Sequence, residues 1–402
     1  MSKEILSERI RNMSESETLA MTRRSRELKC KGFDIINLSI GEPDFNTPEF
    51  IKEAGKRAID ENHTHYPPVS GYPELREVIC KKLKRDNLLT FKPEQIVVSA
   101  GAKQSIANAI LSLVGPGDEV IVPTPYWVSY KEIIKLALGT PVYVETSIEN
   151  DFKITAKQLE AAITPKTKVL LYSSPCNPSG SVYSKEELKS LAEMLTDYKN
   201  IFIISDEIYE FINFEGKHRS IAYYNCLKDR VILVNGVSKG FSMTGWRLGY
   251  MAAPEKIAKA CDKLQGQVTS GINTIAQYAA IEALKVDPKK SPEIQKMVQT
   301  FKERRNFVLE LLQKIPGLQT NVPKGAFYVF PDVSSYFGKK FEGNVIKNST
   351  DLCMYLLEKA CVALVPGEAF GDPNCIRLSY AASKEMLLKA IERIKLALSK
   401  LD

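Results

Sequence analysis

Short apolar runs rich in β-branched residues recur through the middle of this chain, with helical patterns between several of them. Six runs lie at residues 95–98, 119–122, 141–144, 168–172, 201–204 and 231–234, and residues 248–252 are a candidate seventh. Runs that are apolar throughout are typical of strands buried on both faces, as in a parallel sheet covered by helices. The pattern therefore predicts an α/β fold with a mostly parallel seven-stranded sheet.

A different pattern begins near residue 288. A long charged helix is predicted at about residues 293–314. Two short apolar runs follow near Val362 and Ile376, and an amphipathic helix starts at Lys384. Strands and helices in this arrangement indicate a smaller α+β domain.

The length of 402 residues exceeds what one hydrophobic core usually fills, so two domains are expected. We predict that residues 46–290 form the large domain. Residues 1–45 and 291–402, from the two ends of the chain, are predicted to form the small domain together.

Charge, histidine and cysteine content narrow the class of protein. The net charge of +7 is spread without a long Lys/Arg block, so a nucleic-acid partner is not expected. No apolar run approaches the roughly 20 residues of a membrane helix, and the charged segment Met1 to Arg11 lacks the apolar core of a secretion signal. Eight cysteines without a C-x-x-C pair, and three histidines without ligand spacing, indicate reduced thiols in the cytoplasm and no metal site.

Polar or glycine-containing segments directly follow five of the predicted strands. They are Ala100–Lys103, Pro123–Trp127, Ser173–Pro178, Asp206–Tyr209 and the loop that contains Lys239. In a parallel sheet the carboxyl ends of the strands meet at one edge, where ligands of α/β proteins bind. These segments together form the candidate functional site.

The loop Ser238–Arg247 places a lysine and an arginine eight positions apart among glycines and serines. A lysine in such a loop can form a Schiff base with pyridoxal 5′-phosphate (PLP), while the arginine holds the phosphate with a planar, permanently charged fork. The freed amine of Lys239 can then carry a proton between substrate and cofactor. A solvated surface lysine is the alternative interpretation.

Asp206 is a candidate partner of the pyridine nitrogen, which an anion would keep protonated so that the ring can accept electrons. A helix N-cap is an equal alternative. Tyr209 and Asn177 can donate hydrogen bonds to the ring hydroxyl, although core packing and turn chemistry also explain them. Trp127 can stack on the ring or belong to the core. We also predict that Asn177–Pro178 is a candidate cis peptide.

Two further segments carry candidate anion-binding groups. Gly101, Ala102 and Lys103 open a predicted helix, whose first N–H groups bind phosphate well, although an ordinary strand–helix turn has the same residues. Arg377 lies in an otherwise strand-like apolar run and needs a buried partner. A substrate carboxylate suits this guanidinium bidentately, and a structural salt bridge is the alternative.

Together these motifs resemble the class I aminotransferases of the fold-type I PLP enzymes, and most of all the bacterial aspartate aminotransferase subgroup. The resemblance runs nearly end to end. It is carried by Gly41–Phe45, Tyr66–Pro68, Pro125–Tyr130, Asn177–Gly180, Ser205–Glu210, the loop from Lys239 to Arg247, and Arg377–Tyr380. Cys176 departs from the family pattern, in which asparagine is common at that position.

The resemblance implies roles for the candidate residues. Lys239 would bond to PLP, and the ring would be held by Asp206, Tyr209, Asn177 and Trp127. The phosphate would be surrounded by Gly101, Ala102, Lys103 and Arg247, with Tyr66 reaching the phosphate of the neighbouring subunit in a homodimer. The substrate α-carboxylate end would be bound by Gly41, Trp127, Asn177 and Arg377, and Lys103 would help to hold a side-chain carboxylate.

The reaction implied by the resemblance is transfer of the amino group of L-aspartate to 2-oxoglutarate through PLP in a ping-pong sequence, giving oxaloacetate and L-glutamate. An aromatic or prephenate aminotransferase would share the cofactor residues and differ in side-chain recognition. A carbon–sulfur lyase on the same fold would eliminate rather than transfer. A non-catalytic binding protein is disfavoured because the full set of cofactor residues is present.

Overall fold

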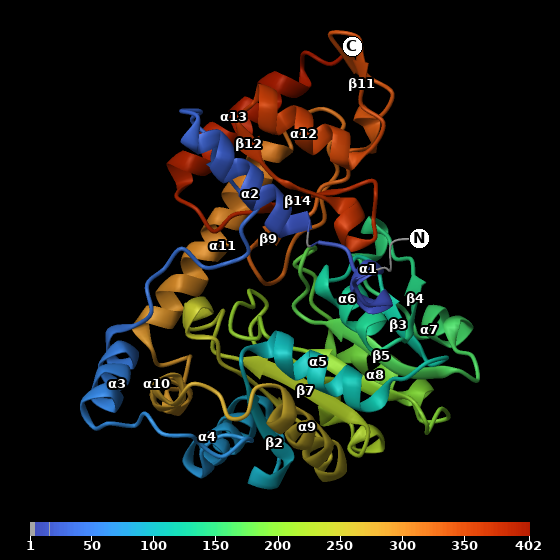
Figure 1. Ribbon diagram of the computed structural model, residues 1–402. Coiled ribbons are helices and arrows are strands. Elements are labelled where there is room, and N and C mark those ends of the chain that lie inside the picture. The colour runs from blue at the N-terminus through green and yellow to red at the C-terminus, as the bar shows by residue number, and fades with distance from the viewer. Residues whose placement is uncertain (1–4, 16) are drawn as a thin grey trace.

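The computed structural model describes residues 5–15 and 17–402, so the first four residues of the charged N-terminal segment lie outside it. Figure 1 shows a lower part built around a large twisted sheet and an upper part in which the blue N-terminal and red C-terminal segments meet. Helix α1 (Glu8–Arg11) lies near the lower part, whereas α2 (Glu17–Cys30) belongs to the upper part. Among the described helices, none is both long and apolar enough to cross a membrane.

The large sheet contains seven strands in the order β2-β8-β7-β6-β5-β3-β4. Their bounds are β2 (Ile96–Ser99), β3 (Glu119–Pro123), β4 (Thr140–Val144), β5 (Thr167–Ser173), β6 (Phe202–Asp206), β7 (Val231–Gly236) and β8 (Gly249–Ala252). Strands β7, β6, β5, β3 and β4 pair in parallel, and only β8 runs antiparallel to its two neighbours. The predicted α/β fold with a mostly parallel seven-stranded sheet is confirmed.

Helices cover both faces of this sheet because successive strand residues point to opposite sides. Along β5, Val169 and Leu171 pack on one face, together with α5 (Ala102–Leu113), α6 (Ser129–Leu136) and α9 (Glu255–Val268). Leu170 packs on the other face, together with α7 (Ala156–Ala162) and α8 (Lys185–Leu195). Burial on both sides explains why these strands are apolar throughout.

Three further helices complete the lower part, and a long one leads out of it. Helix α10 (Thr274–Lys285) packs against α3 (Glu49–Asp60) and α4 (Pro73–Lys82). The charged helix predicted at about 293–314 is α11 (Pro292–Leu312), which rises from α10 into the upper part (Figure 1).

The upper part has short strands and two C-terminal helices, α12 (Ser349–Lys359) and α13 (Lys384–Leu398). Its sheets are β13-β14-β9, a parallel pair β1-β12 and the hairpin β10-β11. The strands are β1 (Ile36–Asn37), β9 (Tyr328–Val329), β10 (Lys340–Phe341), β11 (Asn344–Val345), β12 (Val362–Ala363), β13 (Val365–Pro366) and β14 (Ile376–Ser379). This is the predicted α+β arrangement.

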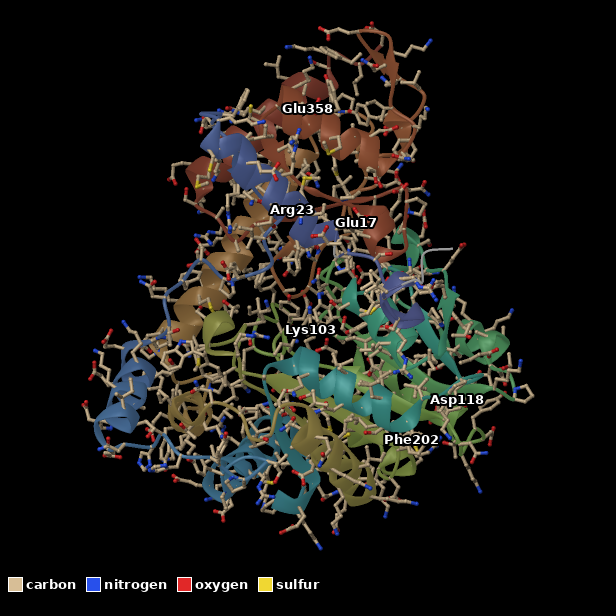
Figure 2. All side chains as sticks on the ribbon, in the orientation of Figure 1. Glu17, Arg23, Lys103, Asp118, Phe202 and Glu358 are labelled. Atoms are coloured by element: carbon tan, nitrogen blue, oxygen red, sulfur yellow. The ribbon has the colours of Figure 1, made fainter. Side chains whose placement is uncertain are left out.

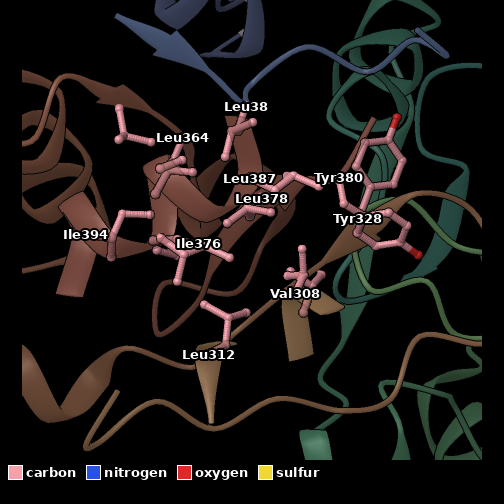
Figure 3. Packing of buried hydrophobic residues seen from close by; sticks show 14 of the residues in the cluster. Leu38, Val308, Leu312, Tyr328, Leu364, Ile376, Leu378, Tyr380, Leu387 and Ile394 are labelled. Atoms are coloured by element: carbon pink, nitrogen blue, oxygen red, sulfur yellow. The ribbon is translucent and has the colours of Figure 1, made fainter. Parts of the chain in front are cut away.

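One hydrophobic core joins the two ends of the chain in this upper part. Figure 3 shows Leu38 beside Leu364, Leu378 and Leu387, with Val308 of α11 below them. All five side chains are fully or almost fully buried. The N-terminal segment is therefore held by residues about 270 to 350 positions further along the chain, although the boundaries of the two predicted domains stay a prediction.

Candidate active site

A cavity of about 260 Å³ lies beyond the carboxyl ends of the central parallel strands. Ten residues singled out in the sequence line it: Gly41, Ala102, Lys103, Trp127, Asn177, Asp206, Tyr209, Lys239, Arg247 and Arg377. Figure 2 labels Lys103 between the lower and upper parts of the molecule. The structure thus brings together segments from seven places in the chain.

Asp206 ends strand β6 and has only 4% of its surface exposed. Its Oδ2 accepts a hydrogen bond from the Tyr130 hydroxyl at 2.8 Å, and its Oδ1 accepts one from the Ile208 N–H at 3.2 Å. Burial raises the pKa of Asp206 to about 6, although the Tyr130 hydrogen bond opposes the increase. A turn rather than a helix follows Asp206, so the carboxylate is not a helix N-cap.

Lys239 is partly buried in the loop that follows β7. Its Nζ donates to the Gly41 carbonyl oxygen at 2.6 Å and lies 5.7 Å from the centre of the Tyr209 ring. Burial lowers the pKa of Lys239 to about 8 because a low-dielectric environment disfavours the charged amine. A solvated surface lysine is therefore not what the structure contains.

The start of α5 and Arg247 form a concave, positively charged end of the cavity. Gly101 precedes the helix with φ +87°, and a Cβ atom built there would lie 2.5 Å from Nη2 of Arg247. Arg247 donates from Nη1 to the Thr244 carbonyl at 2.9 Å and from Nη2 to the Ala100 carbonyl at 3.3 Å. The helix start and the guanidinium together suit a phosphate.

Arg377 lies in β14 with only 2% of its surface exposed. Its Nη1 donates to Oδ1 of Asn177 at 3.0 Å and its Nη2 donates to the Ser39 carbonyl at 2.5 Å, while its Nε has no hydrogen-bond partner. Within the described residues Arg377 forms no salt bridge. Because a buried cation without an anion is costly, this side chain is suited to an external carboxylate.

A second cation without an acidic partner lies at the same cavity. Nζ of Lys103 is 5.0 Å from the centre of the Trp127 ring, and no described carboxylate pairs with it. Burial, followed by repulsion from Arg247, lowers the pKa of Lys103. Trp127 lines the cavity and also packs against the core, so the core contact is present and stacking on a ring stays a prediction.

Several cavity residues have no role in the sequence-based prediction. Tyr328 of β9 is fully buried, and its hydroxyl forms a 2.8 Å hydrogen bond with that of Tyr209. A Cβ atom on Gly41 would lie 2.7 Å from the Tyr328 hydroxyl, so this close approach requires glycine. Thr18 and Leu19 reach the cavity from α2. Their sequence surroundings carry no signal of a site, because the contacts depend on the packing of the chain ends.

Tyr66 and the predicted cis peptide bond are the two features that differ from the rest of the predicted site. Tyr66 is 94% exposed and does not line the cavity of its own chain; it lies in a shallow groove with His65 and Asn273. The prediction of a cis bond at Asn177–Pro178 is wrong, because the cis peptides recorded in the described residues are Thr124–Pro125 and Ser174–Pro175. Both flank the cavity segments that follow β3 and β5.

Known proteins are similar to this chain in sequence and in architecture. A protein of Petunia hybrida called bifunctional aspartate aminotransferase and glutamate/aspartate-prephenate aminotransferase is 48% identical over 98% of this chain and 82% of its own length. The crystal structure of an aspartate aminotransferase from Rhizobium meliloti matches with a TM-score of 0.95 and 40% identity, over 99% of this chain and 100% of the other. The aspartate aminotransferase of Thermus thermophilus with maleate matches with a TM-score of 0.92 and 40% identity, over 98% and 100%.

The family model described as aminotransferase class I and II matches residues 34–394. That range contains every residue of the sequence-based site prediction. The similar solved structures also have the same fold over nearly the whole chain. The chain therefore belongs to the class I and II aminotransferases, a family whose activity implies PLP as the cofactor.

Proposed function

We propose that this aminotransferase is a PLP-dependent aspartate aminotransferase, which transfers the amino group of L-aspartate to 2-oxoglutarate. The observation that carries the proposal is a set of four cations, Lys103, Lys239, Arg247 and Arg377, that line one cavity without an acidic partner among the described residues. Lys239 and Arg247 are assigned to the cofactor, so Arg377 and Lys103 are left for a substrate with two carboxylates. The maleate of the Thermus thermophilus structure is a dicarboxylate as well.

The residues at the cavity fit PLP at both of its ends. Asp206 is a buried carboxylate with no cationic partner at ion-pair distance, which suits a protonated pyridine nitrogen. The space left by the missing side chain of Gly101, beside Arg247 and the start of α5, suits the phosphate. When bound, PLP supplies an electron sink for the carbanion that forms at the substrate α-carbon.

The side chains at the cavity would then have separate roles. The Asp206 carboxylate would hold a proton on the pyridine nitrogen, and the Tyr209 hydroxyl would donate to the ring oxygen. Arg377 would fix the α-carboxylate, with Asn177 held against it. Nζ of Lys239, whose pKa is lowered to about 8, would take up and return the proton of the α-carbon.

We further propose a domain organisation and an oligomeric state for this enzyme. Residues 46–290 would form the cofactor-binding domain, and residues 1–45 and 291–402 the small domain. The enzyme would be a cytoplasmic homodimer in which Tyr66 completes the phosphate site of the neighbouring subunit. The exposure of Tyr66 in the single chain supports this arrangement, because a side chain with 94% of its surface exposed is free to contact a second chain.

A single-turnover absorbance measurement tests the proposal. The protein loaded with PLP is mixed with L-aspartate alone and then with 2-oxoglutarate. We expect aspartate to remove the visible absorbance of the bound cofactor and 2-oxoglutarate to restore it. If aspartate has no effect but phenylalanine removes the absorbance, the substrate assignment is wrong. Prephenate is tested in place of 2-oxoglutarate in the same measurement, because the name of the Petunia hybrida relative includes prephenate aminotransferase.

A further inference from the structure

Tyr130 is the only described side chain that donates a hydrogen bond to Asp206. It lies in the first turn of α6, is completely buried, and places its hydroxyl 2.8 Å from Oδ2 of the carboxylate. Its ring forms a T-shaped contact with Trp127, with ring centres 5.6 Å apart and an angle of 87° between the planes. The ring is thus fixed by packing, and its hydroxyl is directed at one carboxylate oxygen.

We infer that Tyr130 is a positioning residue: its hydroxyl orients the Asp206 carboxylate and keeps it ionised, so that Asp206 can pair with the pyridine nitrogen of the cofactor. The inference rests on the proposed function, since it concerns the affinity of the site for PLP. Tyr130 itself does not line the cavity. It therefore acts through Asp206 and not by contact with the cofactor.

The charges around Asp206 explain why this donor is needed. Burial favours the neutral acid, and the neighbouring Glu207 carboxylate also raises the pKa of Asp206. Lys239 acts in the opposite direction, but only as a weaker influence than the hydrogen bonds from Tyr130 and the Ile208 N–H. The Cys176 thiol and the Tyr209 hydroxyl also face the carboxylate, and burial raises the pKa of both.

Tyr130 is suited to donate over the whole working pH range. Burial, followed by the charge of Asp206, raises the pKa of its hydroxyl well above the usual value, so the proton stays on the tyrosine. A hydrogen bond to a charged group is typically worth a factor of about ten or more in an equilibrium constant. Without this hydroxyl we expect the pKa of Asp206 to rise from about 6 to about 7.

The test is the binding of pyridoxine 5′-phosphate to Tyr130→Phe and to the unmodified protein. This probe has the ring and the phosphate but no aldehyde, so it cannot bond to Lys239. If only ionised Asp206 binds it, the dissociation constant of the variant should be about fivefold larger at pH 6 and nearly equal at pH 8.5. Because the probe is the same in both measurements, its own titration cancels in the ratio of the two dissociation constants. Tyr126→Phe is the matched control, because Tyr126 is buried in the same segment and no described hydrogen bond joins its hydroxyl to Asp206.

The pH dependence of binding distinguishes a positioning role of Tyr130 from a purely structural role. The inference is supported if the dissociation constant of Tyr130→Phe, divided by that of the unmodified protein, rises as the pH falls, and if Tyr126→Phe shows no such rise. A ratio that is independent of pH overturns the inference, because a purely structural defect would weaken binding equally at every pH. If Tyr130→Phe does not fold, a fluorinated tyrosine placed at position 130 keeps the shape but donates more strongly. It should shift the pH dependence toward lower pH, and an unchanged profile would overturn the inference. If the unmodified protein binds neither this probe nor PLP, the proposed function itself fails.

Discussion

At the scale of single residues, the reactivity of Lys239 is set by its surroundings. Its amine has the Gly41 carbonyl as a hydrogen-bond acceptor and no salt bridge within the described residues, and burial lowers its pKa to about 8. Only the neutral amine can attack the aldehyde of PLP. We therefore expect the rate of covalent PLP capture by the apoprotein to rise with pH and to level off above about pH 8.

Stopped-flow absorbance over a range of pH measures this rate. An ordinary lysine, with a pKa of about 10.4, would give a rate still rising at pH 9, and that result would contradict the prediction. Lys239→Ala is the control. It should form no covalent adduct and lose transamination by a factor of about 10³ or more, while PLP still binds non-covalently.

Lys103 is the residue that is expected to separate dicarboxylic from other substrates. Lys103→Ala removes one of the two cations assigned to the substrate, so the KM for aspartate and glutamate should rise by about tenfold. This is the low end for a charged hydrogen bond, because Lys103 keeps much of its surface exposed although its amine is partly desolvated. The KM for alanine should change little. Steady-state kinetics measures both, with the exposed Lys256→Ala as control. Unchanged aspartate kinetics would show that Lys103 does not select the substrate.

At the scale of elements, the turn between β2 and α5 leaves no room for a side chain at Gly101. Gly101→Ala would adopt φ +87° with a Cβ atom 2.5 Å from Arg247 Nη2. Strain of this kind costs about 1–3 kcal/mol. We also expect PLP to bind about tenfold more weakly, which corresponds to about 1.4 kcal/mol.

Urea unfolding and PLP titration separate these two effects. Gly117→Ala is the matched control, because Gly117 has φ +89° but no atom within 4 Å of the position of a Cβ. It should lose stability without losing affinity for PLP. If both variants bind PLP as the unmodified protein does, the start of α5 is not the phosphate site.

The elements themselves were largely predictable from the sequence, because each carries its signal locally. All seven apolar runs are strands of the large sheet, and the predicted helices at 293–314 and from Lys384 are α11 and α13. The order of the strands was not predictable. The position of β8 between β2 and β7 depends on packing between segments that lie about 150 residues apart in the chain.

The site also has residues that local sequence patterns predict and residues that only the tertiary packing reveals. Residues with a chemical signature at a strand end, such as Lys239 and Asp206, were correctly placed at the cavity, because the local pattern marks the end of each strand. Tyr130 and Tyr328 were not assigned a role, because an apolar neighbourhood makes a buried tyrosine look like core. Their hydroxyl contacts with Asp206 and Tyr209 appear only when α6 and β9 are packed on the ends of the strands.

At the scale of the whole molecule, the chain leaves one predicted site residue outside its own cavity. Tyr66 is exposed, and it shares a shallow groove with Asn273 and its neighbours. A residue with no contact to its own active site can act in that of a second subunit. We therefore expect sedimentation at micromolar concentration to give a mass twice the 45.0 kDa of the chain.

Tyr66→Phe tests whether that second subunit completes the phosphate site. Loss of a hydrogen bond to a charged phosphate costs about 1.5–3 kcal/mol, so PLP should bind at least about tenfold more weakly while the dimer persists. Tyr223→Phe is the control, because Tyr223 is also an exposed tyrosine that forms no hydrogen bond through its hydroxyl within the described part of the chain. A monomeric protein, or a dimer in which Tyr66→Phe binds PLP normally, would mean that each chain completes its phosphate site alone. Since the cavity already contains Arg247 and the start of α5, that outcome would leave the cofactor assignment intact and remove only the shared site.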